Sequence, residues 1–329
     1  MSAKRWMVSL LLAVALWAAA TTTVSADVND GVHWEMETAA DRLSIGKMTL
    51  VYEPAVEDEA RAMLQQLPRV WADLEAALNR DLDDELNVRF VEHAGHVARA
   101  THMPHWVAGV AHSSTGDIML AQHGPDGAPA NLAGLLRHEL AHVALYRATN
   151  GAPLPRWFNE GVADSLAEEI DFGATERLAG AVFGRGVPAL DKLDATFRED
   201  PQAVAVAYSA SRDFVNFLRF RDPTGRAFDQ LLFGLRHGKH FETAVLAAYG
   251  IGLYELDAEW REGLLGRFAW FPMLSAEGLP VFLVGPLVGL AWWRRRRVLR
   301  RAWARLEAED EAERRFRMES SNSWAWHSP

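Results

Sequence analysis

Residues 131–163 have the sequence NLAGLLRHELAHVALYRATNGAPLPRWFNEGVA, and this stretch decides how the chain around it folds. Asn131 is a residue type that caps helix starts, and Asn150-Gly151 supplies a stop. Arg137 and Arg147 indicate a helix in a globular core rather than a membrane span. Apolar residues line one side of this helix, at Leu132, Leu135, Leu136, Leu140 and Val143.

The helix carries His138-Glu139-Leu140-Ala141-His142, in which the two histidines are four residues apart. Residues at this separation lie on one face, one turn apart, so both imidazoles can bind one zinc ion. Glu139 lies beside that ion, where a carboxylate can take a proton from the attacking water and pass it to a leaving amine. Because HExxH also occurs by chance, its meaning depends on the residues that follow.

Glu160 lies 18 residues after His142 and is the predicted third metal ligand. One helix, a turn and a second helix can bring it back to the two histidines. Two histidines and one glutamate, with water in the fourth position, form a catalytic zinc arrangement. The alternative is a solvated carboxylate stabilised by a helix dipole. Zn²⁺ is the expected cofactor, and the absence of cysteine excludes thiolate ligands.

The string Trp157-Phe158-Asn159-Glu160-Gly161-Val162-Ala163 is close to the Trp-x-Asn-Glu-Gly-x-Ala pattern of aminopeptidase N relatives. Together with HExxH, it makes the chain resemble the gluzincin zinc metallopeptidases. Within that group the chain is most similar to the peptidase MA-like domains, which are related to the catalytic domains of thermolysin and aminopeptidase N. The resemblance runs from about Trp106 to Leu265.

The resemblance implies two further roles. Asp164 follows Glu160 by four residues, as in the ExxxD pattern of thermolysin, and would accept a hydrogen bond from a ligand histidine and fix its tautomer. Tyr208 lies in a segment that resembles the downstream helix of these domains, and its phenol would donate a hydrogen bond to the oxyanion. The alternatives are a surface acid at Asp164 and a core residue at Tyr208.

One substrate-binding element of the aminopeptidase N relatives is missing. Those proteins carry a Gly-Ala-Met-Glu-Asn string that grips the free amine of the substrate, and this chain has none. Residues 109–112, followed by 117–120, are expected to form an edge strand that aligns an extended peptide by backbone pairing. Both features favour an endopeptidase over an aminopeptidase.

Periodicity elsewhere predicts an α+β fold. Helical spacing over residues 56–80 predicts a helix that Pro68 kinks or splits, and the chain from Asn131 onward is expected to be mainly helical. The expected architecture is a small mixed or antiparallel N-terminal sheet packed on a mainly helical, zincin-like lobe. Alternation of apolar residues predicts strands at 47–53, 87–91, 106–111 and 117–121.

Apolar segments near both ends predict membrane targeting. Residues 1–26 have the charged start, apolar run and small terminal residues of a signal peptide, although an uncleaved anchor is the alternative. Residues 271–293 end in Trp292-Trp293 and are followed by four arginines, which predicts one transmembrane helix. The alternative there is a buried core helix followed by a basic surface.

These segments predict the domain organisation. Residues 27–270 form an extracytoplasmic metallopeptidase-like domain, with a sheet lobe at 27–130 and a helical lobe at 131–270. Residues 294–329 form a basic cytoplasmic tail. A signal peptide, one membrane helix and no cysteine are typical of a bacterial cell envelope, so the domain is expected to be periplasmic or extracellular.

Charge is distributed unevenly along the 329 residues, whose formal net charge is −10. Residues 294–329 contain ten arginines and six acidic residues, whereas residues 27–293 contain 22 basic and 38 acidic ones. The acidic body argues against a nucleic-acid partner. The expected partners are a peptide or protein substrate and, through the C-terminal helix, the membrane.

Six further histidines precede the metal motif. A second metal site is one interpretation, but their spacings match no helical or hairpin clamp, so most are interpreted as surface or cleft residues. They are His93, His96, His102, His105, His112 and His123.

The sequence therefore predicts a membrane-anchored zinc metallopeptidase that uses zinc-activated water and Glu139 as general base. The alternative is a zinc-binding but non-proteolytic, membrane-tethered binding or assembly module of the cell envelope, because metal ligation and turnover are separate properties.

Overall fold

The computed structural model of the chain has two compact units, residues 1–268 and 269–329. The predicted signal peptide, residues 1–26, lies outside the part of the chain that the structure describes. The described residues are Trp34, 40–104, 107–167, 172–269, Phe271, 287–301, Trp303, Arg305, Glu307, Glu311 and Arg314.

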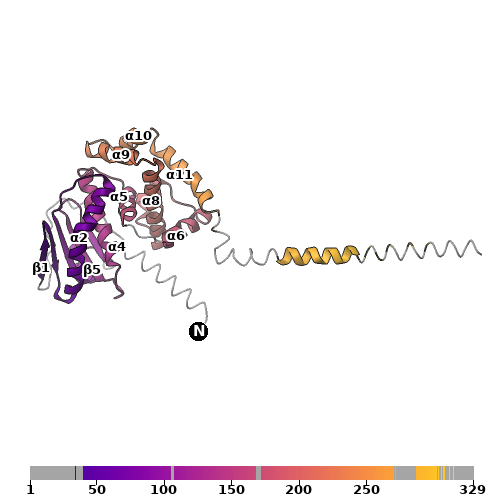
Figure 1. Ribbon diagram of the computed structural model, residues 1–329, viewed down its shortest axis with the longest axis horizontal. Helices are drawn as coiled ribbons and strands as arrows, with labels where there is room; N and C mark the ends of the chain where they lie inside the picture. Colours follow the sequence, from indigo (N-terminus) through magenta and orange to yellow (C-terminus); the bar gives the residue numbers. More distant parts are fainter. Residues whose placement is uncertain are drawn as a thin grey trace, which may run out of the picture. The chain divides into compact units, whose positions relative to one another are not determined.

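A five-stranded mixed sheet begins the first unit (Figure 1). Its strands are β1 (Asp41–Ile45), β2 (Met48–Tyr52), β3 (Leu86–His93), β4 (Gly109–His112) and β5 (Asp117–His123). Their order is β1-β2-β3-β5-β4. The strands β2, β3 and β5 run parallel, while β1 and β4 lie antiparallel at the two edges. The predicted mixed sheet and the α+β class are confirmed.

The four predicted strands are present, with ends shifted by a few residues. The structure adds β1 and the short helix α3 (Ala94–Thr101), which the sequence did not predict. Four of the five residues of β1 are exposed, and its alternation is limited to two apolar residues, Leu43 and Ile45, which is a weak signal for a strand. The strand predicted at 106–111 begins at Gly109 within the described residues.

Between β2 and β3 the chain forms the short 3₁₀ helix η1 (Pro54–Val56) and then α2 (Glu57–Leu78). Helix α2 continues through Pro68, so the predicted split is wrong. An interior proline costs about 3 kcal/mol, whereas burying one large apolar side chain contributes about 1.5–3 kcal/mol. The free energy gained by burying one face of α2 therefore exceeds the cost of the proline. The large apolar residues on that face are Met63, Leu67, Trp71, Leu74 and Leu78.

The predicted central helix is α4 (Leu132–Ala148). The Asn131 side chain accepts a hydrogen bond from the Gly134 N–H at 3.3 Å, which confirms the predicted cap. After the helix, Asn150 and Gly151 have φ angles of 54° and 68°, as a helix stop requires. Helix α4 contacts α2, β4 and β5 on the sheet side and α5 (Arg156–Leu166) in the helical lobe (Figure 1). The helix with both histidines thus joins the two lobes.

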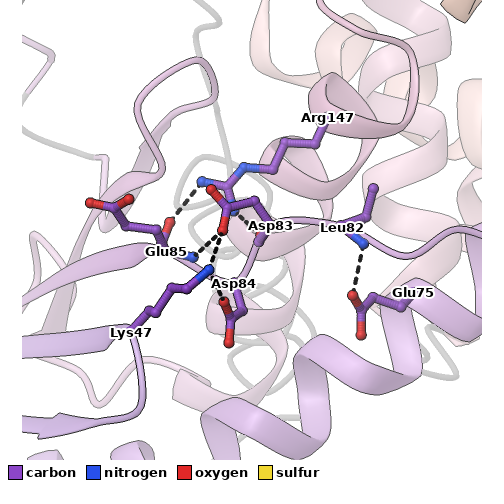
Figure 2. A network of polar contacts seen from close by, with 7 residues as sticks. All are labelled: Lys47, Glu75, Leu82, Asp83, Asp84, Glu85 and Arg147. Carbon is purple, nitrogen blue, oxygen red and sulfur yellow. Dashed lines mark hydrogen bonds and ion pairs between the residues drawn. The ribbon is translucent and has the colours of Figure 1, made fainter.

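Arg147 ties the C-terminal end of α4 to the loop before β3 (Figure 2). Its guanidinium donates to the backbone carbonyls of Asp83 and Glu85, the latter at 2.7 Å. Two acidic residues of the same loop, Asp83 and Asp84, form ion pairs with Lys47, which lies in the β1–β2 turn, at 3.1 and 3.2 Å. Because the planar guanidinium of Arg147 donates hydrogen bonds to two backbone carbonyls at once, it fixes α4 against the sheet lobe.

Helices build the second lobe, which confirms the mainly helical prediction. After α5 the chain forms α6 (Phe172–Phe183), α7 (Leu190–Thr196), α8 (Pro201–Arg221), α9 (Arg226–Arg236), α10 (Phe241–Tyr249) and α11 (Leu253–Arg267). Their core is aromatic: the Phe214 ring lies 5.3 Å from Trp157 and 5.2 Å from Trp260, measured between centroids. Phe158 and Phe241 are 4.9 Å apart. This core holds α5 between α4 and α8.

In the second unit, residues 287–301 are helical and exposed. Within the described residues, no helix combines the length and apolar character needed to cross a membrane. Residues 272–286, which make up most of the predicted transmembrane segment, lie outside the described part of the chain.

Candidate metal centre

Helices α4 and α5 bring His138, His142 and Glu160 together. Ligand atoms of these three side chains all lie within 4.8 Å of one another, and no other group of three or more metal-ligating residues in the described part of the chain does so. The two imidazole Nε2 atoms are 3.1 Å apart. Oε2 of Glu160 lies 3.8 Å from Nε2 of His138 and 3.7 Å from Nε2 of His142.

These separations suit one small cation. Ligand atoms 2.0–2.2 Å from a tetrahedral zinc ion lie about 3.3–3.6 Å from one another. Two imidazole nitrogens and one carboxylate oxygen are also the donor types of a catalytic zinc site. The residues present therefore fit Zn²⁺ in both geometry and chemistry.

The other ring nitrogen of each histidine has its own partner. Nδ1 of His138 lies 2.9 Å from Oδ1 of Asp164, where the family resemblance implied an acceptor. Nδ1 of His142 lies 3.1 Å from Oδ1 of Asn159. Each Nδ1–H donates to its oxygen, which orients the ring so that Nε2 faces the centre as the atom that would bind a metal.

Asn159 is a residue that the sequence analysis quoted but gave no role. The available signal was its place directly before Glu160 on α5, which carries Asp164 one turn further on. Asparagine at this position orients one ligand imidazole, just as Asp164 orients the other.

The centre is deeply buried, and burial governs its protonation. His138 and His142 are 5% and 3% exposed, and Glu139 and Glu160 are fully buried. Burial, opposed by His138 and reinforced by Glu160, raises the pKa of Glu139 to about 8. Burial and the neighbouring His138 lower the pKa of His142 to about 3.

For His138, burial lowers the pKa, but the hydrogen bond and charge of Asp164, with Glu139 and Glu160, outweigh it and raise the pKa to about 9. Neither oxygen of Glu139 has a hydrogen-bond partner among the described residues. Buried carboxylates without enough donors require a cation or protons to offset their desolvation. A divalent cation held by His138, His142 and Glu160 would supply that charge.

Arg156 is a second functional candidate that the sequence analysis missed. Its Nε lies 3.6 Å from Oε1 of Glu160, one helical turn away on α5. Its guanidinium lies 4.6 Å from the centre of the Phe197 ring, which the Tyr208 ring contacts edge-on at 4.9 Å. These contacts link Tyr208, which is buried on α8, to the metal ligands through two intermediate side chains. The catalytic role of Tyr208 remains a prediction.

The start of α5 is fixed by Asp194 from α7. Its carboxylate accepts hydrogen bonds from the backbone N–H groups of Arg156 and Trp157, at 3.1 and 2.8 Å. A carboxylate at this end satisfies otherwise unpaired N–H groups and complements the helix dipole. It thereby sets the direction in which α5 presents Glu160.

The predicted edge strand is β4, the end strand of the sheet order on the side of β5. It packs directly on α4: a Cβ atom at Gly109 would lie 2.7 Å from Cδ1 of Leu135 and 2.9 Å from Oε1 of Glu139. A side chain at this position would require Leu135 and Glu139 to shift, so glycine favours this close approach of strand to helix. The backbone of the edge strand therefore passes beside Glu139.

Gly161, directly after Glu160, allows α5 to pack closely on α8. A Cβ atom there would lie 2.5 Å from the Ser211 backbone carbonyl oxygen and 2.7 Å from Cγ2 of Val215. We expect Gly161→Ala to lower the free energy of unfolding by about 1–3 kcal/mol, because a backbone atom cannot move aside without shifting a helix. Denaturant unfolding of the purified protein measures the change.

Gly180 on α6 is the matched control, because nothing lies within 4 Å of a Cβ atom added there. Gly180→Ala is expected to stabilise the protein by up to about 1 kcal/mol through helix propensity. Equal effects of the two substitutions would contradict the close-packing explanation.

Comparison with known protein families supports a metallopeptidase-like site. No curated protein matches the chain. The family model described as the peptidase MA superfamily matches residues 81–266. The match covers more than half of the 329 residues and includes every predicted site residue. The chain therefore belongs to the peptidase MA superfamily.

Proposed function

We propose that the protein is a zinc-dependent endopeptidase with His138, His142 and Glu160 as metal ligands and Glu139 as general base. The observation that carries the proposal is the buried convergence of three ligand atoms within 4.8 Å, beside a fourth, fully buried carboxylate. Membership of the peptidase MA superfamily supports the same chemistry.

A zinc ion held by His138, His142 and Glu160 would polarise the scissile carbonyl as a Lewis acid and would lower the pKa of the attacking water. Glu139 takes the proton from that water and delivers it to the leaving amine. Burial raises the pKa of Glu139 in the metal-free centre, and a zinc cation held beside it would lower that pKa and favour the charged carboxylate that accepts the proton. Asp164 and Asn159 hold the ligand imidazoles, and the Tyr208 phenol donates to the developing oxyanion.

Substrate alignment follows from the position of β4. A peptide strand that pairs with this sheet edge gains backbone hydrogen bonds without needing a particular terminus. Because Gly109 brings the strand backbone against Glu139, the paired peptide passes the general base. Together with the missing amine-binding string, this arrangement favours cleavage within a chain.

Attachment to a membrane is the second part of the proposal and is supported by the sequence. Residues 1–26 act as a signal peptide, and residues 271–293 act as one membrane helix followed by four arginines. The metallopeptidase domain, residues 27–270, then lies on the periplasmic or extracellular side, and residues 294–329 lie in the cytoplasm. The peptide or protein substrate is consequently a molecule of the cell envelope or its surroundings.

Metal removal tests the proposal. We expect the full-length protein, purified in detergent, to contain one tightly bound zinc ion and to cleave denatured protein at internal bonds. A chelator should abolish cleavage, and one equivalent of zinc should restore it. Elemental analysis and mass spectrometry of the products provide the two measurements. Undiminished cleavage by the metal-free protein would overturn the proposal, and removal of single N-terminal residues would overturn its endopeptidase part.

A further inference from the structure

Three histidines outside the catalytic centre gather at the carboxyl ends of the parallel strands. His93 ends β3 and His123 ends β5, and their Cα atoms are partners in the parallel register. The two ring centroids are 5.3 Å apart. His96 lies in the first turn of α3, with its ring 6.0 Å from that of His93. The carboxyl ends of parallel strands are where open sheets commonly bind ligands.

Two of these imidazoles are oriented by a hydrogen bond at Nδ1. Nδ1 of His96 lies 2.7 Å from Oε1 of Glu53, which directly follows β2. Nδ1 of His123 lies 3.2 Å from the backbone carbonyl oxygen of Glu92. Since a carboxylate and a carbonyl only accept, Nδ1 is the donor in both contacts, which leaves Nε2 of each ring as the atom that could bind a ligand.

The acceptor Glu53 is itself held in place. It is only 6% exposed, and its Oε2 accepts a hydrogen bond from the Glu92 N–H at 2.8 Å. A carboxylate behind an imidazole is the arrangement that orients histidine ligands in metal sites, and a partly buried carboxylate, Asp164, lies behind His138 in the same way.

We propose that His93, His96 and His123 form a second site, which binds a divalent transition metal of the class that prefers imidazole, such as Zn²⁺, Ni²⁺ or Cu²⁺. The side chain of His93 is 49% exposed, so it rotates toward the other two imidazoles when the ion binds. Oε1 of Glu92 lies 3.5 Å from Nε2 of His93 and offers an oxygen ligand beside it.

The two sites differ in burial and therefore in expected affinity. His138, His142 and Glu160 are buried and already converge, whereas the second group lies at the surface and needs one side chain to turn. Ordering an exposed side chain reduces the net free energy of binding. The second ion is therefore the weaker and more readily exchanged one.

Calorimetric titration with Zn²⁺ tests the second site in the full-length protein. We expect zinc-loaded wild type to bind one more ion, and His93→Ala and His123→Ala to weaken that event more than about 100-fold. Glu53→Gln should weaken it about 10–100-fold, as loss of an orienting charge does. Binding should persist in His142→Ala, which removes a ligand of the catalytic centre only, so the two sites are tested separately.

His237→Ala is the matched control. This exposed histidine bonds to its own helix, with Nδ1 2.8 Å from the Phe233 carbonyl oxygen, and should leave the second event unchanged. No second ion at millimolar zinc would overturn the proposal. Equal weakening by His237→Ala would do the same, because it would indicate adventitious binding to surface histidines.

Discussion

Glu139→Gln is expected to lower kcat/KM for peptide cleavage by about 10²–10⁴-fold while the protein keeps its tightly bound zinc. Glutamine has the shape of glutamate but cannot take the proton of the attacking water. The three ligand atoms come from His138, His142 and Glu160, so metal content should not change. Cleavage rates and elemental analysis of the same preparation measure both quantities.

Stability provides a further check on this variant. Glu139 is fully buried, and neither of its oxygens has a hydrogen-bond partner among the described residues, so its pocket disfavours a charge. The metal-free variant should therefore be at least as stable to denaturant as metal-free wild type. Glu242→Gln, on the exposed surface of α10, is the matched control and should leave cleavage unchanged.

An unchanged cleavage rate in Glu139→Gln would contradict the assignment of the general base. A different outcome favours the other interpretation of the sequence. That outcome has three parts: the variant retains zinc, neither protein cleaves peptides, and the biological effect persists in the variant. The chain would then act as a zinc-binding module of the envelope rather than as a peptidase.

His142→Ala is expected to weaken zinc binding at the catalytic centre by more than about 100-fold and to abolish cleavage. Losing a group that only orients a ligand costs about 10–100-fold in affinity, and His142 is itself a proposed ligand. The substitution also leaves Asn159 without the imidazole that it contacts at 3.1 Å. Competition with a chromophoric chelator measures the affinity.

His237→Ala again serves as the control, since it removes an exposed imidazole far along the sequence from the motif. Wild-type affinity in His142→Ala would show that the tight ion lies elsewhere. If the affinity for zinc falls but the cleavage rate is unchanged, the reaction does not depend on this metal ion, which would contradict the proposed mechanism.

Much of the architecture could be predicted from local patterns. The cap at Asn131, the stop at Asn150-Gly151 and four of the strands follow from residue types and periodicity over a few positions. Strand β1 was not predicted, because this exposed edge strand offers only two alternating apolar residues, Leu43 and Ile45. Of the two outcomes predicted at Pro68, a kink or a split, the split is wrong, because one proline was weighed without the burial that holds α2 together.

The sequence by itself determined which residues are the candidate ligands of the centre. Two histidines four residues apart share a helix face whatever surrounds them, and the Glu160 string completes the set through a family resemblance. The comparison with the peptidase MA superfamily agrees with that interpretation.

Only the tertiary structure decided which partners meet across elements. Arg156 beside Glu160, Asn159 on His142 and Gly109 against Glu139 depend on how α4 packs on α5 and β4. The register of β3 against β5 places His93 beside His123, 30 residues away along the chain. Periodicity reports which face a side chain lies on, whereas packing and register decide what that face touches.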